Sequence, residues 1–394
     1  MLLVCRFAHG WMVLLLIAIL VNARRPPPLP RSFRELSSDE VSSLVDARDA
    51  LKNLDANDQN SHLSKILIPR PPDTANNTQV RSYIINTLKR LNWHVEEDMF
   101  TDQTPYGLKT FTNVIATKDP EASRRVVVAA HFDSKFFPSY PQNQFVGATD
   151  SAMPCAMMLD LAEVLDPLLS SRLERLENGL EDDEDVSETT LQLVFFDGEE
   201  AFKDWTDTDS IYGARHLAEK WASSYINPHS KRRLLRDPSP TELSTIEHLI
   251  LLDLLGARHP VVESYFPETG WLFDEMINAE TKLSQGGHLT GPASTVDRYY
   301  SFFRKRTGHE TVYGYIGDDH TPFLTRGVSV LHVISSPFPR VWHKLSDDAT
   351  ALDLSAMRQW NLLMRVFLAG YLNLIPEPSS PMERSHQELV RGVL

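Results

Sequence analysis

Residues 191–196 read LQLVFF and are followed at once by Asp197-Gly198-Glu199-Glu200. Five of the six side chains in the first segment are apolar, so it predicts a strand buried on both faces rather than an alternating surface strand. Strands of this kind belong to sheets that carry helices on both sides. The acidic residues that follow fall at the carboxyl end of the strand, where such sheets place their functional groups.

The rest of the chain alternates between predicted strands and helices. The other predicted strands, several of which are also near-continuous apolar runs, are residues 94–100, 110–117, 125–130, 249–253 and 328–334. The predicted helices are residues 38–54, 78–91, 151–165, 210–222, 271–283 and 354–374. Because strands and helices alternate, the sequence predicts an α/β fold with helices on both sides of the sheet.

The composition is that of an ordinary globular protein. Among 394 residues there are 39 Lys and Arg against 53 Asp and Glu, which gives a net charge of −14. This acidity argues against a protein that binds nucleic-acid phosphates, since that affinity depends mostly on clustered basic side chains. The two cysteines, Cys5 and Cys155, are too few for a disulfide framework or a zinc site made of thiolates. Any metal must therefore be bound by His, Asp and Glu.

The first 23 residues predict a targeting segment. Arg6 precedes an unbroken apolar run at residues 11–21 (WMVLLLIAILV), which is too short to span a bilayer because that takes about 20 residues. We favour a cleaved signal peptide, and the alternative is an uncleaved signal anchor. Such an anchor is the only membrane contact that we expect. Either one sends the chain into the secretory pathway. On that route, Asn76 of the triplet Asn76-Asn77-Thr78 is a candidate glycosylation site.

The chain beyond the leader predicts one domain with flanking segments. Residues 24–37 predict a Pro/Arg-rich linker, residues 38–376 a single domain and residues 377–394 a C-terminal tail. Within the domain, residues 174–188 (ERLENGLEDDEDVSE) hold eight acids against one arginine, which is half of the net charge of −14. Such a charge run predicts a solvated surface loop. A calcium site would need the ligand spacing and glycine of an EF-hand loop, which this segment lacks.

Carboxylates and histidines follow the ends of several predicted strands. They are His131, Asp133, Asp150, Asp197, Glu199, Glu200, Asp253, Asp318, Asp319, His320 and His343. Because the carboxyl ends of parallel strands meet at one edge of a sheet, we expect these side chains to lie together. Such a cluster is costly to bury unless a metal or protons neutralise it. Asp, Glu and His suit a catalytic zinc with three protein ligands and one open position.

The individual residues, and the two tryptophans near them in the sequence, also have simpler interpretations. Asp150 precedes a predicted helix and could cap it. Glu199 and Glu200 could be solvated charges. His343 could be a hydrogen-bonded surface or core residue, as a single histidine more often is. Trp205 and Trp342 could be packing residues. Only the joint placement at strand ends favours a metal centre, and spacing takes the inference no further.

Seven segments of the chain, read together, resemble the animal glutaminyl-peptide cyclotransferases, or glutaminyl cyclases. In chain order they are HFDSK, FVGATDSAMPCAMML, LVFFDGEEAFKDW, DSIYGARHLA, LLDLLGA, DDHTPFLTRGV and SSPFPRVWH. The leader and the proline segment look more like the Golgi-resident branch than the secreted one. The family in turn resembles the zinc aminopeptidases in fold, which implies a three-layer αβα sandwich around a mixed, mostly parallel sheet.

The resemblance implies an activity and its cofactor. Enzymes of this family convert an N-terminal glutamine, and more slowly glutamate, of peptides and proteins into pyroglutamate with release of ammonia or water. One zinc per chain is implied, with Asp150, Glu200 and His343 as its ligands. We therefore expect peptide or protein substrates that begin with Gln or Glu, a monomer, and a location outside the cell or in the Golgi lumen.

Other positions match the catalytic and pocket residues of the family. Glu199 is the implied general acid and base, while Asp253 and Asp318 are the implied hydrogen-bonded pair near the leaving group. The implied pocket residues are Trp205, Phe338, Trp342 and His332. The chain departs from the family at Ala130, where a cysteine that pairs with the one in the PCAMM segment is common. We therefore expect no intramolecular disulfide in a processed chain.

Two other functions stay open at this point. A two-metal aminopeptidase of the same fold would use His131 and Asp253 as ligands of a second metal, and the spacing does not exclude it. A lumenal binding protein without catalysis is the other, although every implied catalytic position is filled.

Overall fold

The computed structural model describes residues 33–180, 189–226, 239–289, 300–307 and 316–376. The predicted leader at residues 1–23 and the predicted tail at residues 377–394 lie outside these ranges. Within them, no helix is both long enough and apolar enough to cross a membrane.

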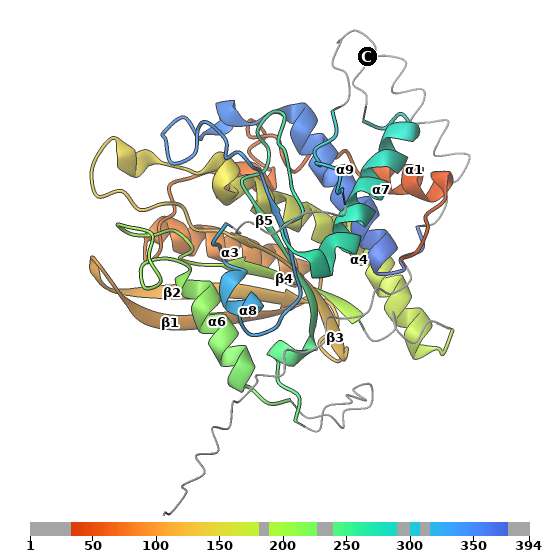
Figure 1. The fold of residues 1–394 in the computed structure, drawn as a ribbon, viewed down its shortest axis with the longest axis horizontal. Helices are drawn as coiled ribbons and strands as arrows, with labels where there is room; N and C mark the ends of the chain where they lie inside the picture. Colours follow the sequence, from red (N-terminus) through yellow and green to blue (C-terminus); the bar gives the residue numbers. More distant parts are fainter. Residues whose placement is uncertain (1–32, 181–188, 227–238, 290–299, 308–315, 377–394) are drawn as a thin grey trace, which may run out of the picture.

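A six-stranded mixed sheet forms the centre of the described part of the chain (Figure 1). Its strands are β1 (His94–Thr104), β2 (Gly107–Thr117), β3 (Arg124–His131), β4 (Thr189–Phe196), β5 (Ile246–Asp253) and β6 (Val330–Ile334). They lie in the order β1-β2-β4-β3-β5-β6. The strand β2 is antiparallel to β1 and β4, whereas β4, β3, β5 and β6 run parallel to one another. All six predicted strands are confirmed, as is the mixed, mostly parallel sheet.

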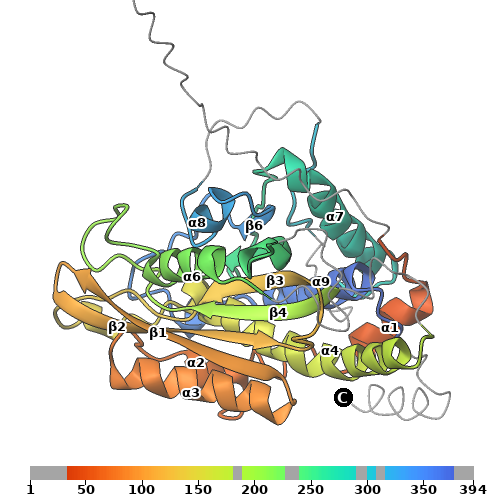
Figure 2. The same ribbon diagram turned by 90° about the horizontal axis from the view of Figure 1, so that it is seen from below.

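Helices cover both faces of this sheet. One face carries α1 (Ser38–Asp46), α2 (His62–Ile66), α3 (Ala75–Arg90), α4 (Met153–Glu177), α7 (Gly270–Gln285) and α9 (Leu354–Tyr371). The other carries α6 (Tyr212–Ser223) and the short α8 (Thr321–Leu324). Figure 2 shows α3 and α4 on one side of the strands and α6 and α8 on the opposite side. The predicted three-layer αβα sandwich is therefore confirmed.

The strands are apolar on both faces because each face has its own core. In β3, Val126 and Val128 pack into the core beside α4, while Val127 and Ala129 pack into the core beside α6. All four side chains are fully buried. Successive side chains of a strand point to opposite faces, so two buried faces require the continuous apolar run that the sequence shows.

Helices α1 and α3 differ from their predicted bounds, and a polar side chain sets the changed end of α3. Helix α1 ends at Asp46 instead of residue 54, and beyond it the Asp49 carboxylate accepts the Leu51 N–H at 3.0 Å in a local turn. Helix α3 begins at Ala75 instead of residue 78, because Thr74 caps it. As a result, Asn76 lies in the first turn of α3, where it is exposed and donates to the Pro69 carbonyl at 2.7 Å.

Helix α4 begins two residues later than predicted, at Met153, and runs on to Glu177. The first four residues of the predicted acidic loop are therefore helical, and residues 181–188 lie outside the described ranges. The extension follows from burial, since Leu169 and Arg172 are both enclosed. The Arg172 guanidinium also donates to the Leu372 carbonyl at 2.8 Å, which fixes the helix against the end of α9.

The end of the predicted linker packs against α9 instead of standing apart from the domain. The Phe33 ring lies 5.6 Å from the Phe367 ring, and Arg34 N–H donates to the Gly370 carbonyl at 3.1 Å. Residues 33–37 therefore belong with the domain, because burial of the Phe33 ring stabilises the folded chain.

A buried ion pair joins α4 to α9. Arg365 donates to the Asp160 carboxylate at 2.7 Å, and both side chains are fully buried. Asn53 and Asn361 complete the network by donating to Asp160 at 2.8 and 2.9 Å.

Removing Asp160 should therefore be strongly destabilising. We expect Asp160→Ala to lower the free energy of unfolding by about 3–5 kcal/mol, because Arg365 is left buried without its counter-charge. Urea unfolding followed by circular dichroism measures this loss. The matched control is Asp274→Ala, which breaks the exposed 2.8 Å pair with Arg306 and should cost at most about 1 kcal/mol. Equal losses in the two variants would contradict the prediction.

Candidate active site

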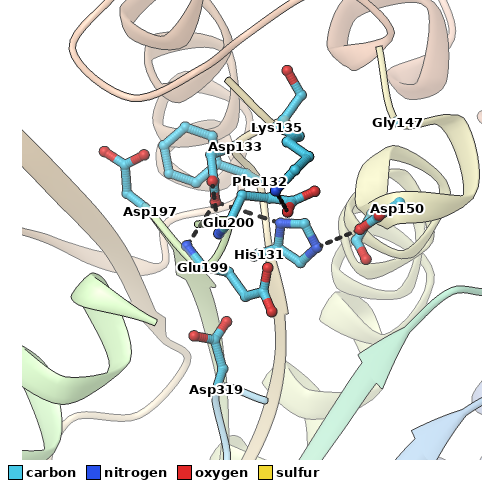
Figure 3. Close-up of polar contacts among 12 residues, drawn as sticks. His131, Phe132, Asp133, Lys135, Gly147, Asp150, Asp197, Glu199, Glu200 and Asp319 are labelled. Carbon is cyan, nitrogen blue, oxygen red and sulfur yellow. Dashed lines mark hydrogen bonds and ion pairs between the residues drawn. The ribbon is translucent and has the colours of Figure 1, made fainter. Parts of the chain in front are cut away.

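The predicted cluster of carboxylates and histidines lies at the carboxyl edge of the parallel strands. His131 ends β3, Asp253 ends β5, and Asp197 to Glu200 follow β4 directly. In Figure 3, His131 lies between Asp133 and Asp150, and the side chains of Glu199 and Asp319 point toward the same space. The expectation that strand ends bring these groups together is confirmed.

Asp133 organises the turn that carries the two adjacent glutamates. Its fully buried carboxylate accepts the N–H of Glu199 at 3.2 Å and the N–H of Glu200 at 3.4 Å (Figure 3). One of the same oxygens lies 3.4 Å from His131 Nδ1. Asp133 thus fixes the glutamate backbone relative to β3, a role that the sequence did not assign.

Gly198 allows this turn to form. Its φ of +76° is in the left-handed region, and a Cβ there would lie 2.4 Å from Phe111 Cε1. The far end of the turn is fixed by Ile211, whose N–H donates to the Glu199 carbonyl at 2.8 Å. The position of Glu199 is therefore set from both sides of its backbone.

Asp150 lies on a separate loop that is held equally firmly. Gly147 is required at its start, because a Cβ there would lie 2.1 Å from the Asp150 carbonyl oxygen. Arg70, which is fully buried, donates to the carbonyls of Val146 and Gly147. The Asp347 carboxylate accepts the Thr149 N–H at 2.9 Å. Sequence reasoning missed Arg70, since no local pattern marks an arginine as buried.

The simple interpretation of Asp150 as a helix cap is wrong. Helix α4 begins at Met153 without any side-chain cap. Instead, Asp150 Oδ1 lies 3.0 Å from His131 Nε2, so the carboxylate faces the site (Figure 3). Cys155, near the start of the same helix, is a buried free cysteine whose thiol donates to the His131 carbonyl.

The three implied metal ligands lie together. His343 Nε2 is 3.5 Å from Asp150 Oδ2 and 3.2 Å from Glu200 Oε2. Among the described residues, Asp150 Oδ2 and Glu200 Oε1 are buried and have no hydrogen-bond partner. The unpartnered Asp150 oxygen beside the His343 imidazole, together with the unpartnered oxygen of Glu200, forms a donor set that fits a divalent cation such as zinc.

The charges around these ligands also favour a cation. Burial and the Glu200 charge raise the pKa of Asp150 to about 7. Burial opposes ionisation of Glu200 as well, but Lys135, His343 and His131 outweigh it and lower its pKa to about 2. Lys135 Nζ lies 3.3 Å from Glu200 Oε2. The site thus confines at least one carboxylate charge in a buried place, which a bound cation would stabilise.

The pKa of Glu199 is shifted in the direction opposite to that of Glu200. Burial raises its pKa well above the usual value, and the charges of Glu200, Asp318 and Asp319 add to this although His131 opposes it. Two adjacent glutamates therefore have pKa values shifted in opposite directions. These opposite pKa shifts suit Glu200 to ligate a metal and Glu199 to exchange protons.

A pocket of about 240 Å³ opens beside these groups. Its lining residues are Asp150, Glu199, Glu200, Trp205, Asp253, Leu254, Ile316, Gly317, Asp318, Ile334, Phe338, Trp342 and His343. The implied residues Trp205, Phe338 and Trp342 all lie in this wall. Leu254, Ile316 and Ile334 were not predicted, because an apolar residue at a wall looks like any core residue in the sequence.

His332 is the one implied pocket residue that does not line the pocket. It lies in β6 and is 2% exposed, with Nε2 2.8 Å from Asp318 Oδ2. The side chain lies behind Asp318, because β6 directs it there, and a part for His332 in substrate binding stays a prediction. His332 supports a pocket residue instead of touching the pocket.

Asp253 and Asp318 both line the pocket, but their hydrogen bonds go to other groups. Asp253 Oδ1 accepts the hydroxyl of Ser151 and the N–H of Leu254. Asp318 contacts His332 and accepts the Asp319 N–H at 2.6 Å. Within the described residues, the implied hydrogen bond between the two carboxyls is not formed. Burial and the Asp253 charge raise the pKa of Asp318, which is the direction that would let the pair share a proton.

Two further groups of side chains have atoms close enough to bind a metal. One comprises His131, Asp150 and Asp253, and the other Asp318, His320 and His332. The first is the second-metal position of the aminopeptidase alternative. Asp253 Oδ1 in this group already accepts two hydrogen bonds, so it is less available to a cation than the unpartnered oxygens of Asp150 and Glu200.

Comparison with known proteins places this fold and site in a family. The model of Peptidase family M28 matches residues 113–368. The chain is 44% identical to glutaminyl-peptide cyclotransferase of Bos taurus, over 79% of this chain and 81% of that protein. It is 43% identical to the glutaminyl-peptide cyclotransferase-like protein of Mus musculus, over 79% of this chain and 74% of that protein. The crystal structure of Macrostomum lignano glutaminyl cyclase superimposes with a TM-score of 0.72 at 34% identity, covering 88% of this chain and 97% of that one.

The fold and the site thus define a member of Peptidase family M28. Within it, the chain belongs to the glutaminyl-peptide cyclotransferases, which confirms the resemblance seen in the sequence.

Proposed function

We propose that this chain cyclises the N-terminal glutamine, and more slowly glutamate, of peptides and proteins to pyroglutamate, with release of ammonia or water. The observation that carries this proposal is the placement of Glu199 in one small pocket with the cluster of Asp150, Glu200 and His343. Family membership supports the same activity.

We assign one zinc to Asp150, Glu200 and His343, because these residues present the unpartnered carboxylate oxygens described above. When bound there, zinc supplies Lewis acidity toward the side-chain amide of the substrate. The His343 ring is held for this task by stacking on Trp342, with ring centres 3.9 Å apart.

Glu199 carries the proton in this mechanism. The substrate's α-amine attacks its own side-chain amide carbon, so one N–C bond forms and the bond to the amide nitrogen breaks. Glu199 accepts the proton that the amine loses and returns it to the departing nitrogen, which leaves as ammonia. Its raised pKa suits this exchange, because a carboxylate with a raised pKa holds a proton more readily near neutral pH.

The other pocket residues orient the substrate. Asp318 lies where it can hold the departing nitrogen, and His332 fixes its carboxylate at 2.8 Å. Trp205, Phe338 and Trp342 surround the glutamine side chain. Ring closure is already unimolecular, so confinement of one residue in the correct conformation supplies much of the rate.

The direct test is a mass measurement. Purified protein is incubated with a peptide that begins with glutamine, and we expect the peptide to lose about 17 Da as ammonia departs. A peptide of the same composition that begins with asparagine is the control. Release of free amino acids without this mass loss would contradict the proposal and favour the two-metal aminopeptidase.

The size of the pocket predicts low selectivity beyond the first residue. A volume of about 240 Å³ holds one residue, so the second residue of the substrate lies outside. Across a set of Gln-X peptides we expect kcat/KM to vary by less than about tenfold, since no enclosed contact distinguishes X. Steady-state kinetics with apolar, acidic and basic X measure this range. A much wider spread would show that the enzyme reads the second residue.

The location and assembly of the chain are also proposals. The leader pattern at residues 1–23 supports entry into the secretory pathway, as a secreted protein or, if the leader stays, as a protein anchored in the Golgi. We propose a monomer with a single domain. Intact-mass analysis of protein from secreting cells would show whether the chain starts near Arg24, and light scattering would give its mass in solution.

A further inference from the structure

Trp205 lies on a loop that is closed at its base. Tyr212 N–H donates to the Gly198 carbonyl at 2.7 Å and Ile211 N–H to the Glu199 carbonyl at 2.8 Å. A loop whose ends are joined in this way is an Ω-type loop, which keeps its shape through its own side chains. Trp205 is 48% exposed, so its position at the pocket depends largely on the backbone of this loop.

One buried carboxylate binds the inside of the loop. Asp209 Oδ1 accepts the Phe202 N–H at 2.9 Å and the Tyr212 hydroxyl at 2.8 Å. Asp209 Oδ2 accepts the N–H groups of Lys203 and Asp204 at 2.9 and 3.0 Å. The residue is 5% exposed. Asp209 therefore binds the three residues that immediately precede Trp205, and the first turn of α6.

The chemistry of this arrangement makes it rigid. Successive backbone N–H groups that converge on one point form a site for an anion, and hydrogen bonds to an ionised group are stronger than neutral ones. Burial opposes the ionisation of Asp209, but the four donors outweigh it and lower its pKa. The Tyr212 ring is itself fixed by stacking on Phe111, with ring centres 4.8 Å apart.

We propose that Asp209 is a positioning residue that holds Trp205 at the rim of the pocket and thereby sets the affinity for substrate. The proposal rests on the proposed function, because Trp205 acts on the substrate only if the pocket takes an N-terminal residue. Asp209 itself touches no substrate.

Asp204 offers a matched control in the same loop. Its side chain is 75% exposed, and its ion pair with Lys203 is long, at 3.9 Å. Asp204→Asn therefore removes the same charge from the same loop without disturbing the backbone donors. Asp209→Asn changes the hydrogen bonds inside the loop. The amide nitrogen of Asn must face some of the N–H groups that donate to the carboxylate in the wild type.

Hydrogen–deuterium exchange tests the holding role without any substrate. In Asp209→Asn we expect one or more of the amides of Phe202, Lys203 and Asp204 to exchange at least about tenfold faster than in the wild type, since the amide nitrogen of Asn replaces one of the two oxygens that accept them. The sheet strands should keep their exchange rates, which shows that the variant is folded. Unchanged exchange at residues 202–204 would overturn the proposal, whatever the enzyme turns over.

Kinetics with a Gln-initiated peptide test the link to Trp205. We expect Asp209→Asn to raise KM about tenfold and to leave kcat within about twofold, because the lost contact acts equally in the ground and transition states. Asp204→Asn should match the wild type. Tyr212→Phe, which removes one of the four donors and keeps the stacked ring, should raise KM by a smaller factor in the same direction.

A double substitution decides whether Asp209 acts through Trp205. Trp205→Ala should raise KM by itself, and adding Asp209→Asn should raise it no further. Additive effects, or a fall in kcat with KM unchanged, would overturn the proposal. If wild-type protein leaves Gln-initiated peptides unchanged, the proposed function is wrong. The hydrogen–deuterium exchange experiment still tests the role of Asp209 in that case, because it needs no substrate.

Discussion

Replacing Glu199 with glutamine should lower kcat for a Gln-initiated peptide by about 100- to 10,000-fold, the range expected when a general acid and base is lost. The substitution keeps the size of the side chain and removes its ability to accept and return a proton. KM should stay close to the wild-type value, because Trp205, Phe338 and Trp342 still form the pocket wall. Steady-state kinetics separate the two parameters.

The same variant should keep its metal, since Asp150, Glu200 and His343 are unchanged. Zinc content by elemental analysis checks this point. The matched control is Glu96→Gln on β1, whose side chain is 61% exposed and which should behave as the wild type. Turnover by Glu199→Gln at the wild-type rate would refute the mechanism. Among the described residues, the other glutamate that lines the pocket is Glu200, which is already assigned to the metal.

Removal of the metal should abolish turnover and destabilise the fold. Without a cation, Asp150 and Glu200 keep buried oxygens that have no hydrogen-bond partner within the described residues, and these groups are costly to leave unsatisfied. Zinc at 100 times its Kd should raise the free energy of unfolding by about 2.7 kcal/mol, because it binds the folded chain only. Thermal melts in chelator and in added zinc, followed by activity after zinc is restored, measure both effects.

Substitution of a ligand should reproduce the loss of metal without a chelator. We expect His343→Ala to lose the response of the melting temperature to zinc, whereas His94→Ala, which changes an exposed histidine on β1, should keep it. The stoichiometry then separates the two enzyme hypotheses. One tightly bound zinc per chain supports the cyclotransferase, whereas two would favour an aminopeptidase that also uses His131 and Asp253.

Much of the fold was predictable because its determinants are local. A strand buried on both faces must be apolar throughout, so residues such as Val126 to Val128 identify β3 without any knowledge of their neighbours. Helix ends were less predictable. Thr74 sets the start of α3 through a single hydrogen bond, and many other polar residues in the chain could have done the same.

The candidate site was predictable in its residue types and only partly in its geometry. Strand ends and family motifs indicated Asp150, Glu199, Glu200 and His343, and the structure brings them together. The position of His332 behind Asp318 was not predictable, because the family motif does not reveal whether a side chain lines a wall or lies behind it. Arg70 and Asp209 were missed altogether, since the groups that they bind are backbone atoms of other segments.

The sequence by itself determined the layers of this protein and the chemistry available at one edge of its sheet, because burial and strand ends leave a local pattern in the chain. Only the tertiary structure decided which carboxylate oxygens stay unpartnered, which histidine faces the pocket and which aspartate holds Trp205. These outcomes depend on distances between segments far apart in the chain. Gly198, for example, must be glycine because Phe111 of β2 lies beside it, and nothing in the residues around Gly198 records that contact.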